Sequence, residues 1–136
     1  MAMEILKRNS DYALRALVGL AELEKDQVAT ARELAESQDL AEPLLRKLLQ
    51  KLVRADIVDS VQGVKGGFKL ARKPRDISVL EVAEAVQGKL VINRCFLGKS
   101  VCPQQGQCHL SEKLVGVQNH LVNFFGKIRL SDLQNK

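Results

Sequence analysis

Three cysteines, Cys95, Cys102 and Cys108, are the only ones in a chain of 136 residues, and they lie within a 14-residue stretch. An odd number of closely spaced thiols argues against a framework of structural disulfides. Thiolates are soft ligands that suit zinc or iron–sulfur clusters, but zinc sites usually pair cysteines about two to four residues apart. The gaps here are six and five residues. The spacing therefore favours an iron–sulfur cluster over two alternatives, a zinc site and redox-reactive thiols.

Three thiolates leave such a cluster one ligand short. His109 directly follows Cys108, but neighbouring residues of a helix point about 100° apart, so both would reach one cluster only with difficulty. His120 lies about three turns further along the last expected helix and is predicted to face solvent or an interface. An acidic residue of a partner subunit is the third candidate. A ligand other than a thiolate would make the cluster more labile, which suits a sensor.

The elements ahead of the cysteines are typical of a helix-turn-helix. Local signals predict three helices, over residues 11–24, 31–37 and 43–54, the first of them capped by Asn9–Ser10. Thr30 and Glu33 are spaced as a capping box, in which each side chain satisfies a free amide at a helix start. Pro43 suits a first helical turn, where an amide hydrogen is not needed. Two short helices joined by a short turn match a helix-turn-helix, although many helical bundles contain such a pair.

A hairpin is expected directly after the third helix. Residues 57–61 and 68–71 have the pattern of two strands, and the loop 62–67 holds three glycines that permit positive φ angles. In this position a basic hairpin is predicted to be a wing, which would lay Lys65 along the sugar–phosphate backbone or in the minor groove. The alternative is an ordinary surface hairpin.

Positive charge is concentrated in the same part of the chain. The whole chain carries a net charge of +5, yet residues 41–75 hold nine basic residues against three acidic ones. The basic residues are Arg46, Lys47, Lys51, Arg54, Lys65, Lys69, Arg72, Lys73 and Arg75. Such a surface attracts polyanions, nucleic acid first among them. On charge alone, a solvated basic face with no partner is an equally good interpretation.

The second half of the chain is expected to hold two more helices around a cysteine loop. Ser78 and Glu81 form another capping box, ahead of a helix over 79–87 that closes at Gly88. Residues 89–107 lack a sustained period and are predicted to be a loop. The last helix carries a narrow apolar seam, formed by Leu110, Leu114, Val117, Leu121, Phe124 and Ile128. This spacing predicts a dimerisation helix that also touches the body, rather than one packed only on the chain's own first helix.

Composition bounds the class of protein. Hydrophobic residues make up 46% and charged residues 27%, as in a folded domain, and only five residues are aromatic. We expect a mainly α fold with a small β-hairpin: a winged helix-turn-helix domain over 1–88, a cluster-binding loop over 89–109, and a dimerisation helix and tail over 110–136. No membrane span or signal peptide is apparent, so a cytoplasmic protein is expected. An enzyme is not, because the two histidines form no catalytic constellation and no nucleotide-binding glycine motif appears.

Three segments carry a resemblance to a known family. They are the opening Asp11–Leu17, the hairpin Ser60–Leu70 and the helix start Ile77–Val79. Together with the three-cysteine loop ahead of a long last helix, they resemble the IscR/NsrR/RirA family of bacterial iron–sulfur transcription regulators. The likeness covers nearly the whole chain.

The resemblance implies a homodimer in which Cys95, Cys102 and Cys108 of each subunit bind a [2Fe–2S] or [4Fe–4S] cluster. In some members the fourth ligand is a histidine three residues past the third cysteine, where this chain has Ser111. In some nitric-oxide sensors it is an aspartate at the head of the partner's first helix, a position that Asp11 matches. Asp11 in trans is therefore preferred over His109. The alternative is that Asp11 binds no cluster and only stabilises its own helix, by placing a negative charge at the positive end of the helix dipole.

For DNA, the resemblance places the start of the third helix in the major groove. Pro43, Arg46 and Lys47 would lie on its reading face, with Arg46 on a base edge, since a guanidinium bridges guanine in two bonds. Lys47, Lys51 and Lys65 are expected to contact phosphates. Thr30 and Arg32 are expected to contact the DNA backbone at the second helix. Gln62 of the wing stands where several relatives have an arginine.

These expectations combine into one functional prediction. The chain would be a regulator of a palindromic double-stranded operator, with a repressor favoured over an activator. Its cluster would sense redox state, nitric oxide or iron and cluster supply, and would change the spacing or angle of the two recognition helices. One alternative is a winged-helix regulator that uses its cysteines as redox thiols or a zinc site. Another is an iron–sulfur carrier that binds no DNA.

Overall fold

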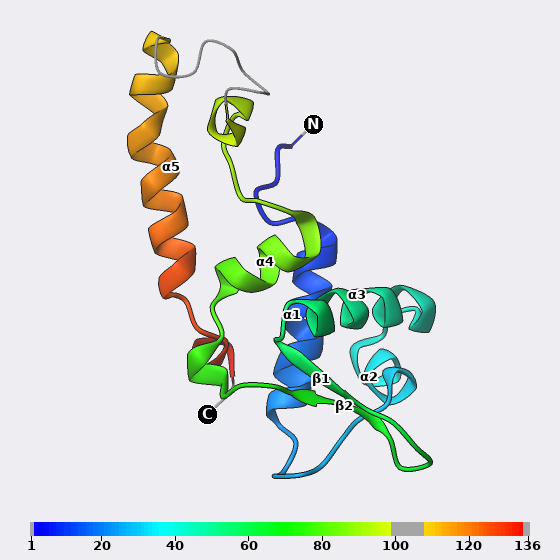
Figure 1. Ribbon diagram of the computed structural model, residues 1–136. Helices are drawn as coiled ribbons and strands as arrows, with labels where there is room; N and C mark the ends of the chain where they lie inside the picture. Colours follow the sequence, from blue (N-terminus) through cyan, green and yellow to red (C-terminus); the bar gives the residue numbers. More distant parts are fainter. Residues whose placement is uncertain (1, 99–107, 135–136) are drawn as a thin grey trace.

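The computed structural model describes residues 2–98 and 108–134. It contains α1 (Arg8–Ala21), α2 (Ala31–Gln38), α3 (Glu42–Arg54), β1 (Val58–Val61), β2 (Gly67–Leu70), α4 (Val79–Gln87) and α5 (His109–Lys127). In Figure 1, α1 to α4 and the hairpin form one body, while α5 stands beside it and rejoins it at its C-terminal end. The predicted mainly α, winged helix-turn-helix fold is confirmed. No helix of these two ranges is long and apolar enough to cross a membrane.

The first helix lies three residues nearer the N-terminus than predicted. Asn9 and Ser10 were expected to cap it, but both lie inside α1, whose first residue is Arg8. Ser10 is fully buried, and its hydroxyl bonds the side-chain oxygen of Gln87 at the end of α4. The prediction that Ser10 caps the helix was therefore wrong. The sequence alone does not distinguish a serine that caps its own helix from one whose hydroxyl bonds a residue far along the chain.

Local chemistry explains the helix-turn-helix. The predicted capping box at α2 is confirmed: the amide of Glu33 donates to the Thr30 hydroxyl at 3.0 Å and the Thr30 amide donates to Glu33 Oε2 at 3.2 Å. Asp39 takes a left-handed conformation, with φ at 54°, and closes α2. Pro43 lies in the first turn of α3. The inner side of α3 is a row of leucines, each at most 2% exposed: Leu45, Leu48, Leu49 and Leu52.

The hairpin is tied to the start of α2. Its antiparallel strands pair Val61 with Gly67 at one end, and the backbone of Phe68 exchanges hydrogen bonds with that of Ala29, at 2.7 and 3.0 Å. A Cβ at Gly67 would lie 2.7 Å from the Ala29 carbonyl oxygen, so this close approach requires glycine. The wing and the capped end of α2 therefore share one rigid frame.

Several contacts hold α4 and α5 in place. Arg72, just after β2, forms an ion pair with Glu81 of α4 at 2.8 Å. Leu130, after α5, is 1% exposed, and its amide donates to the Ile77 carbonyl at 2.8 Å. Gln118 is the buried residue of α5, and its amide bonds the backbone at Leu90 and Ile92. The segment expected to be only loop includes a short 3-10 turn over Arg94–Leu97.

Truncation in the inner row of α3 should be costly. Leu49 is fully buried, and Leu49→Ala is expected to lower the free energy of unfolding by about 2–5 kcal/mol, through lost transfer energy and the cavity left behind. Urea unfolding followed by circular dichroism measures this. Val64→Ala, on a fully exposed hairpin residue, is the control and should change stability by less than about 0.5 kcal/mol. Equal effects of the two changes would contradict the assigned core.

The Glu81 carboxylate makes stability depend on pH. Burial raises the pKa of Glu81, but hydrogen bonds from the Ser78 amide and Arg72, with the charge of Arg72, outweigh it and hold the pKa below its ordinary 4.5. A carboxyl with a lowered pKa stabilises the fold above its unfolded value, and this is lost as the pH falls through the folded value. Glu81→Gln should therefore destabilise at pH 7 and progressively less below pH 4.5, measured by urea unfolding. A pH-independent loss would contradict a role for the charge.

Candidate nucleic-acid interface and cysteine segment

The outward face of α3 is where the predicted reading residues lie. Pro43, Arg46 and Lys47 are all exposed and occupy one side of the helix, opposite the leucine row. Together with Glu42 and Gln50 they line a shallow hollow with a volume of about 470 Å³. Sequence reasoning missed Gln50, although the same helical spacing, extended by one turn, points to it.

Arg46 is oriented by its own helix. Its guanidinium forms a hydrogen-bonded ion pair with Glu42 at 2.7 Å, one turn earlier. Both side chains are about half exposed, so the pair adds little to stability. Its effect is to hold the guanidinium on the outward face. A guanine edge would have to compete with the Glu42 carboxylate for the same donors.

A cleft of about 300 Å³ separates α3 from the wing. Arg46 and Gln50 line it on the helix side, Ser60 and Gln62 on the hairpin side, and Thr30 at the start of α2. The predicted residues Thr30, Arg46 and Gln62 are thus brought together. Two other predicted residues do not line this cleft: Arg32 pairs with Glu36 at 3.3 Å on α2, and Lys65 is exposed in the hairpin loop.

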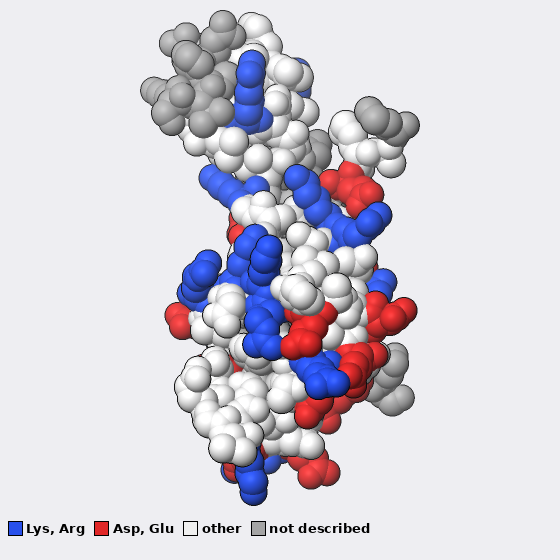
Figure 2. Space-filling model, turned by 90° about the vertical axis from the view of Figure 1, so that its right-hand side faces the viewer, with Lys and Arg blue, Asp and Glu red and all other residues white. Residues whose placement is uncertain are grey.

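Charge is unevenly distributed over this side of the molecule. Figure 2 shows the side toward which α3 and the hairpin tip project: Lys and Arg side chains form a band across its middle, with Asp and Glu side chains gathered mainly to one side. The band gives the face a bias toward a polyanion.

Lys51 differs from the other predicted contacts. Its ammonium donates to the Val86 carbonyl at 3.0 Å, at the C-terminal end of α4. A cation there satisfies a free carbonyl and complements the helix dipole. Lys51 therefore links the recognition helix to α4, and this structural role competes with its predicted phosphate contact.

Two of the three predicted cluster ligands lie in the described residues. Cys95 is 5% exposed in the 3-10 turn, and Cys108 is half-buried immediately before α5; both are free thiols. Cys102 lies outside the described residues. Among the residues described, no group of three His, Cys, Asp or Glu side chains could hold a metal ion. The donor set itself fits an iron–sulfur group, since thiolates are its usual ligands.

The candidates for a fourth ligand lie in different surroundings. The His109 side chain is 96% exposed, and its Nδ1 lies 3.5 Å from Glu112 on the solvent side of α5. Asp11 lies in the first turn of α1, and its carboxylate is 54% exposed beside Arg15 at 3.0 Å. Asp11 is thus accessible to a second chain.

Gln118 fixes the segment that leads to Cys95. Its side-chain amide donates to the Leu90 carbonyl at 2.8 Å and accepts from the Ile92 amide at 2.9 Å, and it is only 7% exposed. One buried amide therefore satisfies both backbone groups. The path toward Cys95 is held against the middle of α5.

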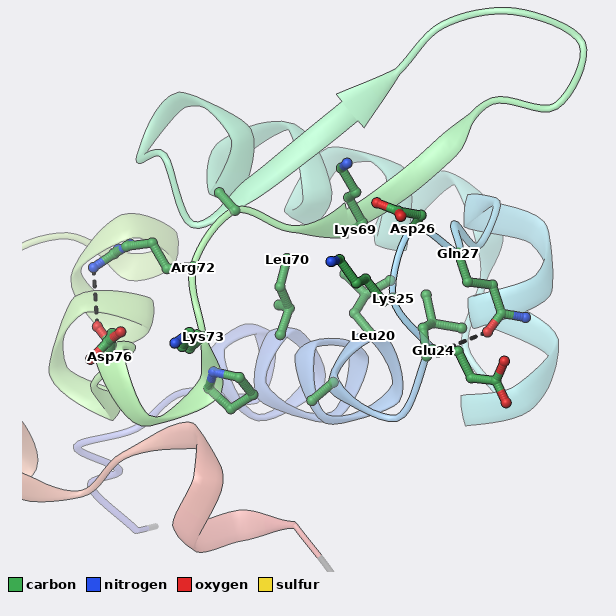
Figure 3. Close-up of a pocket in the computed structure, with 14 residues that line it drawn as sticks. Leu20, Glu24, Lys25, Asp26, Gln27, Lys69, Leu70, Arg72, Lys73 and Asp76 are labelled. Atoms are coloured by element: carbon green, nitrogen blue, oxygen red, sulfur yellow. Dashed lines mark hydrogen bonds between the residues drawn. The ribbon is translucent and has the colours of Figure 1, made fainter.

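A further cavity, of about 540 Å³, lies away from the reading face, between the end of α1 and the end of β2. Figure 3 shows Lys25 and Lys73 around an apolar floor that includes Leu20 and Leu70. Acidic residues also line it, among them Asp26. Among the described residues that line it there is neither a histidine nor a cysteine, and the mixed charges do not favour one kind of ligand.

A helix-turn-helix, a wing tied to it and a basic outward face define the class of winged-helix transcriptional regulators. Over residues 6–136 the chain matches the model of the Rrf2 family, described as "Iron-dependent Transcriptional regulator". The chain belongs to this family.

Relatives support the same assignment. The chain is 34% identical, over 132 residues, to the HTH-type transcriptional regulator IscR of Cereibacter sphaeroides, covering 94% of this chain and 85% of that protein. It is 29% identical to NsrR of Oceanobacillus iheyensis, covering 88% and 80%. The solved structure of T. potens IscR superposes with a TM-score of 0.73 at 26% identity, covering 98% and 87%. The resemblance to IscR and NsrR is confirmed, and these relatives are regulators rather than enzymes.

Lys47 and Lys51 should respond differently to salt. Each phosphate contact that a substitution removes reduces the steepness of the plot of log affinity against log salt concentration by about 1. Lys47→Gln is expected to reduce the slope and weaken binding to a labelled mixed-sequence duplex. Lys51→Gln is expected to leave the slope unchanged, because its ammonium is held by the Val86 carbonyl. Fluorescence anisotropy over a salt series measures both. An equal fall in slope for the two variants would restore Lys51 as a phosphate contact.

Proposed function

We propose that this Rrf2-family regulator is a homodimeric repressor that binds a palindromic operator in double-stranded DNA, with affinity set by an iron–sulfur cluster. The observation that carries the DNA half is the exposed face of α3 beside the wing. Arg46 is the base-reading candidate, and Lys47 and Lys65 the phosphate contacts. Thr30, Arg32 and Gln62 complete the interface. The site of action would be the cytoplasm, and the cluster would report redox state, nitric oxide or iron and cluster supply.

Dimerisation is proposed through α5. The helix has one buried residue, Gln118, while the predicted seam keeps large apolar side chains in solvent: Leu110, Val117 and Phe124 are 51–56% exposed. A stripe at this spacing is typical of a helix that pairs with another helix. Two subunits would present two α3 helices to the half-sites of a palindrome. We propose the units 1–88, 89–109 and 110–136 for DNA binding, cluster binding and dimerisation.

The cluster would be held by Cys95, Cys102 and Cys108, with Asp11 of the second chain as fourth ligand. A bound cluster supplies redox and ligand-exchange chemistry. Residues of this chain would connect the cluster to the DNA-binding helix. Gln118 of α5 holds the segment before Cys95, and Lys51 joins α4, which leads into that segment, to the recognition helix. Changes in the cysteine segment would thus reach the angle of α3.

Anaerobic purification tests the cluster directly. The wild-type protein is expected to be brown, with visible absorption and iron and sulfide in each chain, and Cys95→Ala should lose both. A zinc site would appear instead in metal analysis, and simple redox thiols would show no metal. A colourless, iron-free wild type that still binds its selected DNA normally would contradict cluster sensing, whereas a cluster protein with no salt-dependent affinity for duplex DNA would favour the carrier.

The same preparation tests the fourth ligand. Asp11→Asn should shorten the lifetime of the visible absorption in air, while Asp26→Asn, at an exposed turn residue, should not. Equal lifetimes in all three proteins would leave Asp11 with a role at the helix dipole only.

A further inference from the structure

Gln50 occupies the centre of the outward face of α3. It follows Pro43 by seven residues, which is two helical turns less about 20°, so the two side chains project in nearly the same direction. Arg46 and Lys47, at positions three and four, lie to either side of that line. The side chain is exposed, and the leucine row holds the opposite side of the helix in the core.

Gln50 is also the residue of α3 that, with Arg46, borders both hollows of this face. It lines the shallow hollow beside Pro43 and Lys47, and it lines the cleft between α3 and the wing. Any duplex that fills both hollows passes over it. Arg46 also lines both hollows, but its guanidinium forms an ion pair with Glu42. Gln50 makes no side-chain hydrogen bond to another residue in the described part of the chain.

The chemistry of an amide at that place is specific. Glutamine offers one donor and one acceptor side by side, the pair that matches N7 and the N6 amino group of adenine in the major groove. A phosphate oxygen would use only its donor. From these observations we infer that Gln50 is a specificity-determining residue that reads an adenine–thymine pair, about one helical turn along α3 from the base contact of Arg46. This inference rests on the proposed docking of α3 in the major groove.

Selection of binding sites from a random duplex library by the full-length protein tests the inference. Wild type should select a palindromic motif. Gln50→Ala should lose the base preference at one pair per half-site and bind the wild-type motif roughly 5- to 150-fold more weakly, the range for one good bidentate contact. Gln50→Glu should move the preference at that pair from adenine to cytosine, because a carboxylate only accepts.

Two controls separate the alternatives. Gln38→Ala, a glutamine on α2, should select the wild-type motif, and Lys47→Gln should weaken all sequences alike without changing the motif. The inference is overturned if both Gln50 variants select the unchanged motif, or if they lose affinity equally for every sequence, as a phosphate contact would. If the wild type itself selects no motif, the proposed operator binding fails and the inference fails with it.

Discussion

Burial of Leu45, Leu48, Leu49 and Leu52 on one side of α3 determines what the other side of that helix presents. Because a helix repeats about every 3.6 residues, fixing four leucines in the core fixes the direction of Pro43, Arg46, Lys47 and Gln50. These four residues therefore need no loop to position them. Single changes on the outward face therefore alter chemistry with little effect on stability, whereas changes on the inner face alter the fold.

The end of α4 is the second place on which the arrangement depends. Val86 accepts the ammonium of Lys51 from the recognition helix, and Gln87 bonds Ser10 near the head of α1. Three residues later the chain reaches Leu90, which Gln118 of α5 holds. The recognition helix, the head of α1 and the cysteine segment are thus joined within a few residues, mostly through hydrogen bonds to the backbone. Such contacts are directional, and hydrogen-bond networks are one of the means by which coupling passes between distant sites.

Local chemistry made the order of elements predictable. Both capping boxes form, Pro43 begins α3, and the glycine-rich loop joins two paired strands, because each depends on residues close together in sequence. The predicted start of α1 was wrong because the Ser10 hydroxyl does not cap the helix but bonds the side chain of Gln87, 77 residues away. The charge of Lys51, on which its predicted phosphate contact rests, is visible in the sequence, but its carbonyl partner on α4 is not.

By itself, the sequence determined the class of this protein: the helix-turn-helix, the wing, the basic stretch, the cysteine spacing and the apolar seam all depend on local pattern. Tertiary structure decided which polar groups remain available. It brought the Val86 carbonyl of α4 to the ammonium of Lys51, and it left Gln50 exposed between α3 and the wing. The physical reason is that periodicity gives the direction of a side chain, whereas its partners come from elements that only folding brings together.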